Sequence, residues 1–440
     1  MRFYNRTSEL AELRRIQNLS FEDHSRLTVI TGRRRIGKTS LVMNVMEGTP
    51  WVYLFVGRKS EASICAEFIS IISKSLDCYV PVEIKSFRSL FHFLMEKAEN
   101  RPFNLIIDEF QEFYNINASI YSDMQNIWDQ YRHKTKMNLV VCGSVHSLMQ
   151  KIFQHSKEPL FGRADNIIKL SAFDLNTLRE IIKDFHPQYT NDDLLALYAF
   201  TGGVPKYVEL FCENAILSVD EMIHFMVRQN SSFTEEGKHL LIEEFGKNFA
   251  TYFSILSAIS GGINTQPTIE AALGDKNIGG HIKRLIGDYN IIVRQRPLLA
   301  KEGSQTVRYE IQDNFIRFWF NYFDRHRSLI EIKNFDGLKS IIKNDYSTYS
   351  GKILETYFKQ KFAESMQYRA IGSWWEPKGA KNEIDIVALS LEKNEAIAVE
   401  VKRNKKNFKE EIFLAKVKHL KNKVLPNYQI KTLCLSLEDM

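Results

Sequence analysis

The sequence has no long apolar run and no pattern of paired cysteines. A membrane-spanning helix needs about 20 consecutive apolar residues, and no stretch of the 440 residues approaches that length. Residues 1–9, MRFYNRTSE, lack the apolar core of a signal peptide. The five cysteines are scattered and contain no Cys-x-x-Cys pair, so neither a disulfide framework nor a zinc ribbon is indicated. These absences predict a cytoplasmic protein with no membrane partner.

A strong net charge is also absent, but the small surplus is unevenly distributed. The chain has 59 Lys and Arg against 53 Asp and Glu, or +6. From Glu331 onward there are 20 basic and 15 acidic residues, and Lys402–Lys431 holds ten basic residues with only two acidic ones, Glu410 and Glu411. Two interpretations stay open: a surface for a polyanion such as nucleic acid, or a solvated lysine-rich helix face.

Apolar and amphipathic segments alternate through the first 171 residues. The expected strands span 27–31, 51–56, 103–107, 138–142 and 166–170. The expected helices between them span 38–46, 61–76 and 120–131. This alternation predicts an α/β fold with a doubly wound parallel sheet. Residues 172–233 lose the strand signal, so we expect a helical lid there.

The rest of the chain has two further patterns. In 234–330, helical segments (240–259, 265–273 and 280–287) precede an expected β-hairpin over 291–311, the order of a winged helix. An aromatic run at 314–323 is expected to be a packed inter-domain helix. In 331–440, a small α/β domain is expected. Its helices are expected over 351–362 and 410–423, and its strands over 383–389, 396–401 and 430–435.

A phosphate-binding loop follows the first strand. It reads Gly32-Arg33-Arg34-Arg35-Ile36-Gly37-Lys38-Thr39, followed by Ser40 at the start of a helix. In a G-x-x-x-x-G-K-T loop the glycines let backbone N–H groups surround the β-phosphate, and the helix N-terminus adds its positive end. Lys38 would reach the β- and γ-phosphates, and the Thr39 hydroxyl would bind Mg²⁺. The cofactors predicted are ATP and Mg²⁺.

Two carboxylates end the third expected strand. Asp108 and Glu109 follow the apolar run Leu105–Ile107 and would emerge beside the phosphates. Asp108 would hold Mg²⁺, mostly through water, and Glu109 would polarise an attacking water, which favours hydrolysis. Ser144, at the end of the strand expected between the other two, would sense the γ-phosphate. No Asn-Lys-x-Asp motif is present, which disfavours a GTPase.

These motifs resemble those of the archaeal-type ATPases, AAA+/STAND-like P-loop proteins of archaea and bacteria. The resemblance is carried by the residues 3–10, 32–39, 107–109, 143–144, 159–163 and 202–205. It implies that the segment Asn5–Leu10, with Asn5 and Arg6 as its site residues, lies near the adenine and that 202–205 is the lid turn that senses nucleotide state. It also implies that Arg163 serves the γ-phosphate, in its own subunit or from a neighbouring subunit of a homo-oligomer; an ordinary surface salt bridge is the alternative.

The likeness extends to the C-terminal region, which resembles a domain of unknown function commonly fused to these ATPases. In that region, alternation along two strands predicts that Asp385, Glu400 and Lys402 converge on one point. Asp385 and Glu400 would hold Mg²⁺, Lys402 would orient water or steady charge, and Glu355 on the preceding helix would be a further ligand. The order is similar to the PD-(D/E)XK nuclease fold, with Ile384-Asp385 in place of proline-aspartate.

The sequence therefore predicts an ATP-hydrolysing enzyme that acts on DNA through a winged helix and a nuclease-like domain. For the last domain, an active nuclease, an inactive nuclease fold and a coincidence of charged strand ends stay open. The alternative function is a non-cleaving ATP-dependent switch whose C-terminal domain only binds nucleic acid or a protein.

Overall fold

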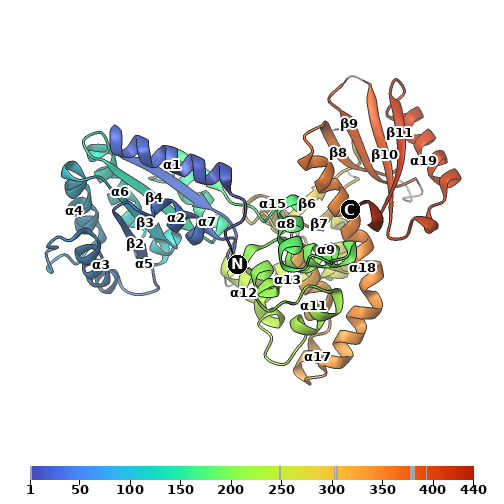
Figure 1. The fold of residues 1–440 in the computed structure, drawn as a ribbon, viewed down its shortest axis with the longest axis horizontal. Coiled ribbons are helices and arrows are strands. Elements are labelled where there is room, and N and C mark those ends of the chain that lie inside the picture. Colours follow the sequence, from blue (N-terminus) through green and yellow to red (C-terminus); the bar gives the residue numbers. More distant parts are fainter. Residues whose placement is uncertain (1, 247–248, 302, 304–305, 377–381, 393) are drawn as a thin grey trace. The chain divides into compact units, whose positions relative to one another are not determined.

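The fold consists of two compact units, Tyr4–Ala172 and Phe173–Met440, the second including the first residues of the chain (Figure 1). The computed structural model describes residues 2–246, 249–301, 303, 306–376, 382–392 and 394–440. Among the helices in these ranges, none combines the length and the apolar character needed to cross a membrane. Each unit is described by itself below.

The first unit contains a five-stranded, fully parallel sheet, in agreement with the predicted α/β fold. Its order is β2-β3-β4-β1-β5. The strands are β1 (Arg26–Thr31), β2 (Trp51–Phe55), β3 (Phe103–Asp108), β4 (Met137–Gly143) and β5 (Asn166–Lys169). Because all strands are parallel, their carboxyl ends share one edge, where the phosphate-binding loop and the ends of β3 and β4 meet.

Helices cover both faces of this sheet. They are α1 (Thr7–Glu22), α2 (Lys38–Met46), α3 (Glu61–Leu76), α4 (Phe87–Asn100), α5 (Phe113–Ile116), α6 (Ser119–Tyr131) and α7 (His146–Gln154). Side chains alternate along each strand, so Val29 and Leu105 face the core formed with α3, α4 and α6. On the other face, Gln17 of α1 donates to Asn104 of β3 across 3.0 Å.

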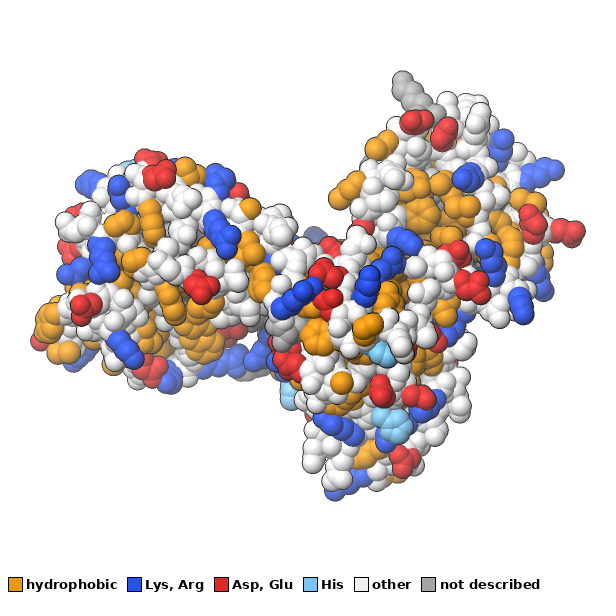
Figure 2. Space-filling view, in the orientation of Figure 1, with side chains coloured by type: hydrophobic (Ala, Val, Ile, Leu, Met, Phe, Trp, Pro, Cys, Tyr) orange, Lys and Arg blue, Asp and Glu red, His pale blue; other side chains and the backbone are white. Residues whose placement is uncertain are grey.

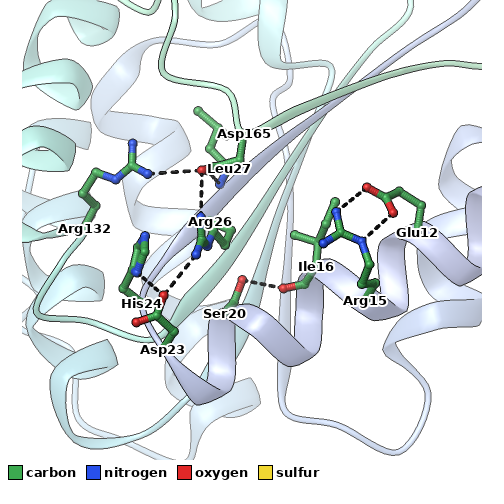
Figure 3. Close-up of polar contacts among 10 residues, drawn as sticks. All are labelled: Glu12, Arg15, Ile16, Ser20, Asp23, His24, Arg26, Leu27, Arg132 and Asp165. Atoms are coloured by element: carbon green, nitrogen blue, oxygen red, sulfur yellow. Dashed lines mark hydrogen bonds and ion pairs between the residues drawn. The ribbon is translucent and has the colours of Figure 1, made fainter.

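A polar cluster fixes β1 at the end opposite the phosphate-binding loop (Figure 3). The Asp165 carboxylate accepts from the backbone N–H of Leu27 at 2.8 Å and from Arg132 at 3.1 Å. Arg26 bridges Asp165 at 3.4 Å and Asp23 at 3.0 Å. The exposed ion pairs contribute only about 0–1 kcal/mol each, so the part-buried bond from the Leu27 N–H to Asp165 is the contact that most firmly holds the strand leading into the loop.

The second unit begins with helices, as predicted for 172–233. These are α8 (Leu175–Phe185), α9 (Asn191–Thr201), α10 (Pro205–Glu213) and α11 (Val219–Met226). The segment expected as one helix over 240–259 is instead two, α12 (Phe233–Phe245) and α13 (Phe249–Ser260). Gly246 ends α12 at φ 60° and ψ −139°, a backbone conformation that glycine adopts readily because it has no Cβ.

Next comes a module of three helices and a hairpin, in the predicted order. Its elements are α13, α14 (Gln266–Ala272), α15 (Gly279–Gly287), β6 (Ile292–Gln295) and β7 (Arg308–Ile311), the last two paired antiparallel. The aromatic run then forms α16 (Asn314–Phe318) and a π-helical turn over Trp319–Asp324. Its six rings are buried, and Phe318 contacts Phe200 of α9 and Tyr349 of α18 (Phe335–Glu364), which confirms the packed helix.

The C-terminal domain has a four-stranded sheet in the order β11-β10-β9-β8. Its strands are β8 (Tyr368–Trp374), β9 (Ile384–Ser390), β10 (Glu395–Lys402) and β11 (Gln429–Ser436), and its helices are α17 (Arg327–Glu331), α18 and α19 (Glu410–Lys423). Arg403, directly after β10, forms two bonds of 2.9 and 2.6 Å with the Asp192 carboxylate in α9. This ion pair attaches the C-terminal sheet to the helices that precede it.

Candidate functional site

The phosphate-binding loop lies where its sequence predicts, between β1 and α2. Gly32 and Gly37 have φ of 155° and 89°, and Gly37 directly precedes the first residue of α2. A Cβ on Gly32 would lie 2.8 Å from the Leu170 carbonyl oxygen, so only glycine fits there. The loop residues Arg33, Arg34, Arg35 and Ile36 connect these glycines, and Thr39 and Ser40 form the first turn of α2 with Lys38.

Lys38 is buried and folds back onto its own loop. Its Nζ donates to the carbonyl oxygens of Gly32 at 2.9 Å and Arg33 at 3.1 Å. Burial lowers the pKa of Lys38, while the neighbouring Glu109 acts in the opposite direction. A buried ammonium bound only by carbonyl groups is poorly solvated, so an anionic phosphate is a favourable partner for it.

Asp108 at the end of β3 faces the start of α2. Its Oδ2 accepts from the Thr39 hydroxyl at 2.8 Å and from the Tyr53 hydroxyl of β2 at 2.8 Å. A hydroxyl and a carboxylate oxygen this close together are the hard donors that Mg²⁺ prefers, so the residues fit the predicted metal. Tyr53 was not predicted: its place in a strand gives no sign that its hydroxyl meets Asp108.

Glu109 and Ser144 lie side by side, although they come from the ends of different strands. The Ser144 hydroxyl donates to Oε2 of Glu109 at 2.7 Å. β4 lies between β3 and β1, as the sequence predicts, and this order brings the two ends together. The backbone of Glu109 is left-handed at φ 53°, a conformation that costs a non-glycine residue about 1–3 kcal/mol and persists where the surrounding structure enforces it.

The residues predicted to lie near the adenine adopt unusual backbone conformations. Asn5 and Arg6 have φ of 54° and 71°, and the Arg6 guanidinium donates to the Ser171 carbonyl oxygen. Arg163 forms an ion pair with Asp129 at 3.1 Å and donates to the Phe161 carbonyl oxygen at 2.9 Å. These contacts are those of a surface salt bridge, and a role of Arg163 at the γ-phosphate remains a prediction.

In the C-terminal domain, Asp385 and Glu400 belong to neighbouring antiparallel strands. Val399 pairs with Ile386, so the next step of that register sets Glu400 opposite Asp385 on the same face. The Asp385 carboxylate accepts from the backbone N–H of Val401 at 2.7 Å. Lys402 binds Glu400 at 2.9 Å, which gathers the three predicted residues around the β9–β10 pair.

Charges around this cluster interact strongly. Burial, and then the nearby Asp385, raise the pKa of Glu355 on α18 to about 7. Burial also raises the pKa of Asp385, although the hydrogen bond that its carboxylate accepts from the backbone N–H of Val401 acts to lower that pKa. Burial alone would lower the pKa of Lys402, but Glu400 and Asp385 raise it overall. Two acids that resist ionisation beside a lysine are a common feature of functional sites.

Glu400 is neutralised from two sides. Lys416 of α19 lies 3.2 Å from both of its carboxylate oxygens, in addition to Lys402. Within the described ranges, no three His, Cys, Asp or Glu side chains are grouped so that they could hold a metal ion. Mg²⁺ commonly takes only one or two carboxylates and completes its shell with water and substrate phosphate. The donor chemistry of Asp385 and Glu355 therefore fits Mg²⁺.

The predicted wing contacts the C-terminal sheet beside this cluster. Arg308 of β7 pairs with Glu383 at 2.7 Å and lies over the Trp375 ring at 4.4 Å. The backbone N–H of Leu298 donates to the carbonyl oxygen of Ser373 in β8 at 2.8 Å. On the face of the molecule visible in Figure 2, the C-terminal domain carries lysine and arginine side chains interspersed with acidic ones.

Comparisons with known proteins identify both parts of the chain. Residues 3–211 match a family described as an ATPase domain predominantly from Archaea, and 319–413 match one described as archaeal and bacterial proteins of unknown function. The uncharacterized protein MJECL04 of Methanocaldococcus jannaschii is 30% identical over 410 residues, or 91% of this chain and 87% of its own length. The chain belongs to the archaeal-type ATPase family. It is a nucleotide-binding P-loop ATPase.

One solved structure shows the same fold at low sequence identity, and a second is reported beside it. The Walker-type ATPase paby2304 of Pyrococcus abyssi has a TM-score of 0.52 and 17% identity, over 72% of this chain and 96% of its own. The Aeropyrum pernix ORC2 protein has a TM-score of 0.48 and 14% identity, over 78% and 96%. At this identity the first likeness shows the fold of the archaeal-type ATPase and nothing about its substrate.

Proposed function

We propose that this archaeal-type ATPase uses ATP to control the cleavage of DNA by its C-terminal domain. The observation that carries the proposal is the meeting of Asp385, Glu400 and Lys402 at the β9–β10 pair, with Glu355 beside them. Paired carboxylates can hold a metal ion that assists phosphodiester hydrolysis, and a lysine beside them can stabilise the charge that develops. Two acids whose ionised forms are disfavoured by burial also gain most from a cation that binds between them.

At the ATP site, each residue has a distinct proposed role. Lys38 and the loop backbone bind phosphate in the ground state, so their contribution is to affinity. Thr39 and Asp108 hold Mg²⁺, and Ser144 contacts Glu109 near the γ-phosphate. Glu109 orients the attacking water and contributes to turnover. The division between Lys38 and Glu109 supplies a direct test.

In that test, Lys38→Ala abolishes or strongly weakens nucleotide binding, measured by calorimetry, whereas Glu109→Gln keeps binding and loses turnover. Equal affinity in wild type and Lys38→Ala would overturn the phosphate-binding role.

Arg163→Ala is assayed over a range of protein concentrations, because an arginine supplied by a neighbouring subunit makes turnover per subunit rise with concentration. An arginine finger contributes about 10³-fold or more, so full activity of Arg163→Ala rejects that role.

For the C-terminal domain, we propose that Asp385 and Glu355 hold Mg²⁺ and that Glu400, paired with Lys402 and Lys416, lies beside them. When bound, the metal lowers the pKa of water and neutralises charge that develops on the phosphate. Lys402 lies on the same strand face as Glu400 and would steady that charge. When DNA binds, Lys402 and Lys416 would release the Glu400 carboxylate and contact a DNA phosphate instead.

DNA would be held by sequence-independent contacts to phosphate. We propose that the three-helix and hairpin module acts as a winged helix. Lys283 and Arg284 of α15 and Arg294 of β6 are exposed and would contact one duplex, together with Arg296 near the wing. The basic segment 403–423 would supply further contacts. Because such binding releases counterions, affinity should fall steeply as salt rises.

The decisive experiment follows cleavage of labelled duplex and single-stranded DNA by the full chain, with ATP and either Mg²⁺ or Mn²⁺. Asp385→Ala should lose cleavage and metal affinity, whereas Lys402→Ala should lose cleavage and keep most DNA binding. Glu395→Gln, at an exposed position of β10, is the matched control and should cleave normally. Cleavage that survives in an Asp385→Ala/Glu400→Ala double variant would reveal a contaminant.

One outcome would instead support the non-cleaving switch. That outcome is salt-sensitive DNA binding without cleavage of any substrate under either metal. An unchanged ATPase rate on addition of DNA, together with no binding, would reject action on DNA while leaving the ATPase assignment intact.

A further inference from the structure

A second side chain, Gln111, contacts the carboxylate of Glu109. Its Nε2 donates to Oε2 of Glu109 at 2.5 Å, the same oxygen that accepts from Ser144. Gln111 lies in the short 3₁₀ turn Phe110–Glu112 directly after β3 and is buried. The orientation of its amide is fixed by chemistry, because a carboxylate accepts and only the –NH₂ end of the amide donates.

The surroundings of Gln111 are shaped to keep that orientation. A Cβ on Gly143 would lie 2.6 Å from the Gln111 Oε1 and 2.3 Å from the Met149 Sδ, so the amide occupies space that only glycine leaves open. Within the described residues, Oε1 of Gln111 is buried and accepts no hydrogen bond. The close approach of Gly143 and Met149 therefore holds the amide with its N–H directed at Glu109.

The contact has a defined consequence for Glu109. Two donors on Oε2 fix the rotation of the carboxylate, whose backbone is already held in the left-handed region at φ 53°. Oε1 of Glu109 is then the oxygen left to bind a water. Preorganised groups of this kind avoid a search among rotamers during the reaction, and small misplacements can cost about 100-fold in rate.

We propose that Gln111 is a positioning residue of the ATPase reaction, which together with Ser144 holds the carboxylate of Glu109 in its productive orientation. The proposal rests on the proposed role of Glu109 and adds a residue to it. Gln111 acts only through Glu109, so its loss lowers kcat and leaves nucleotide affinity unchanged.

The test uses Gln111→Met in the full chain. Methionine conserves the volume against Gly143 and Met149, removes the donor and removes the buried oxygen, so stability should be equal to wild type or higher. We expect kcat to fall about 10- to 100-fold with unchanged affinity for a fluorescent ATP analogue. Gln130→Met, at an exposed position of α6, is the control and should turn over like wild type. A wild-type kcat in Gln111→Met would overturn the proposal.

The outcomes distinguish the two levels of the argument. Turnover retained in Glu109→Gln would overturn the role of Glu109 itself. Loss of turnover in Glu109→Gln with normal turnover in Gln111→Met would reject only Gln111.

Discussion

Replacement of Glu355 by glutamine should change how the stability of the protein depends on pH. In the folded protein, burial and the neighbouring Asp385 raise the pKa of this carboxyl from its ordinary value of 4.5 to about 7. Glutamine has the same shape as the protonated acid and never ionises. The variant therefore mimics the form of Glu355 that the folded domain prefers.

Proton linkage gives the sign and the size of this change in the free energy of unfolding. Below pH 4.5 the carboxyl is protonated in both the folded and the unfolded protein, so wild type and variant should be similarly stable. Between 4.5 and 7 the unfolded chain releases the proton while the folded chain retains it, so the free energy of unfolding of wild type falls as pH rises. The difference between the two pKa values corresponds to roughly 3 kcal/mol. Above pH 7 this penalty is constant.

Urea unfolding of the full chain in EDTA, at pH 5, 6, 7 and 8, measures this effect. EDTA keeps divalent metal from the carboxylates. The stability gained by Glu355→Gln over wild type should be small at pH 5 and approach roughly 3 kcal/mol at pH 8. Glu395→Gln, exposed on β10, is the control and should show no such trend. A difference between variant and wild type that is the same at all four pH values would refute the reasoning.

Three further changes should have separable effects. Tyr53→Phe removes the donor to Asp108, so MgATP affinity in calorimetry should fall by about 1 kcal/mol, and an unchanged value would show that the bond is dispensable. Asp165→Ala should lower the free energy of unfolding by about 1–3 kcal/mol in urea titrations, while nucleotide affinity stays at the wild-type level. Arg403→Gln leaves Asp192 without its ion pair to β10, so hydrogen exchange should quicken in β10 and α9; exchange rates equal to wild type would contradict the proposed attachment.

Local patterns predicted the fold class because they reflect local causes. The loop from Gly32 to Thr39 is a contiguous motif, and the apolar runs of β1, β3 and β4 are long enough to identify buried parallel strands. The ends of helices were predicted less well, because the hydrophobic pattern does not mark them clearly. The continuous helical signal over 240–259 hid the break at Gly246, because a glycine within a helical pattern does not reveal its φ.

Several elements escaped prediction altogether. Not predicted were the helices α1, α4, α5, α7 and α17 and the strand β8, although α4 buries six side chains. The C-terminal residues Asp385, Glu400 and Lys402 were predicted to converge because alternation places them on matching faces. Whether they meet depended on the register of β9 against β10, which the structure supplies.

By itself, the sequence determined the phosphate-binding loop, the carboxylates that end β3 and the identity of the residues that can do chemistry. Those depend on spacing along one segment of backbone, which covalent geometry fixes. Only the tertiary structure decided which side chains hold these carboxylates in place. Tyr53 donates a hydrogen bond to Asp108, and Gln111 donates one to Glu109. These contacts depend on the order of strands, on a left-handed residue and on the space left by Gly143, and they arise from the packing of the whole sheet.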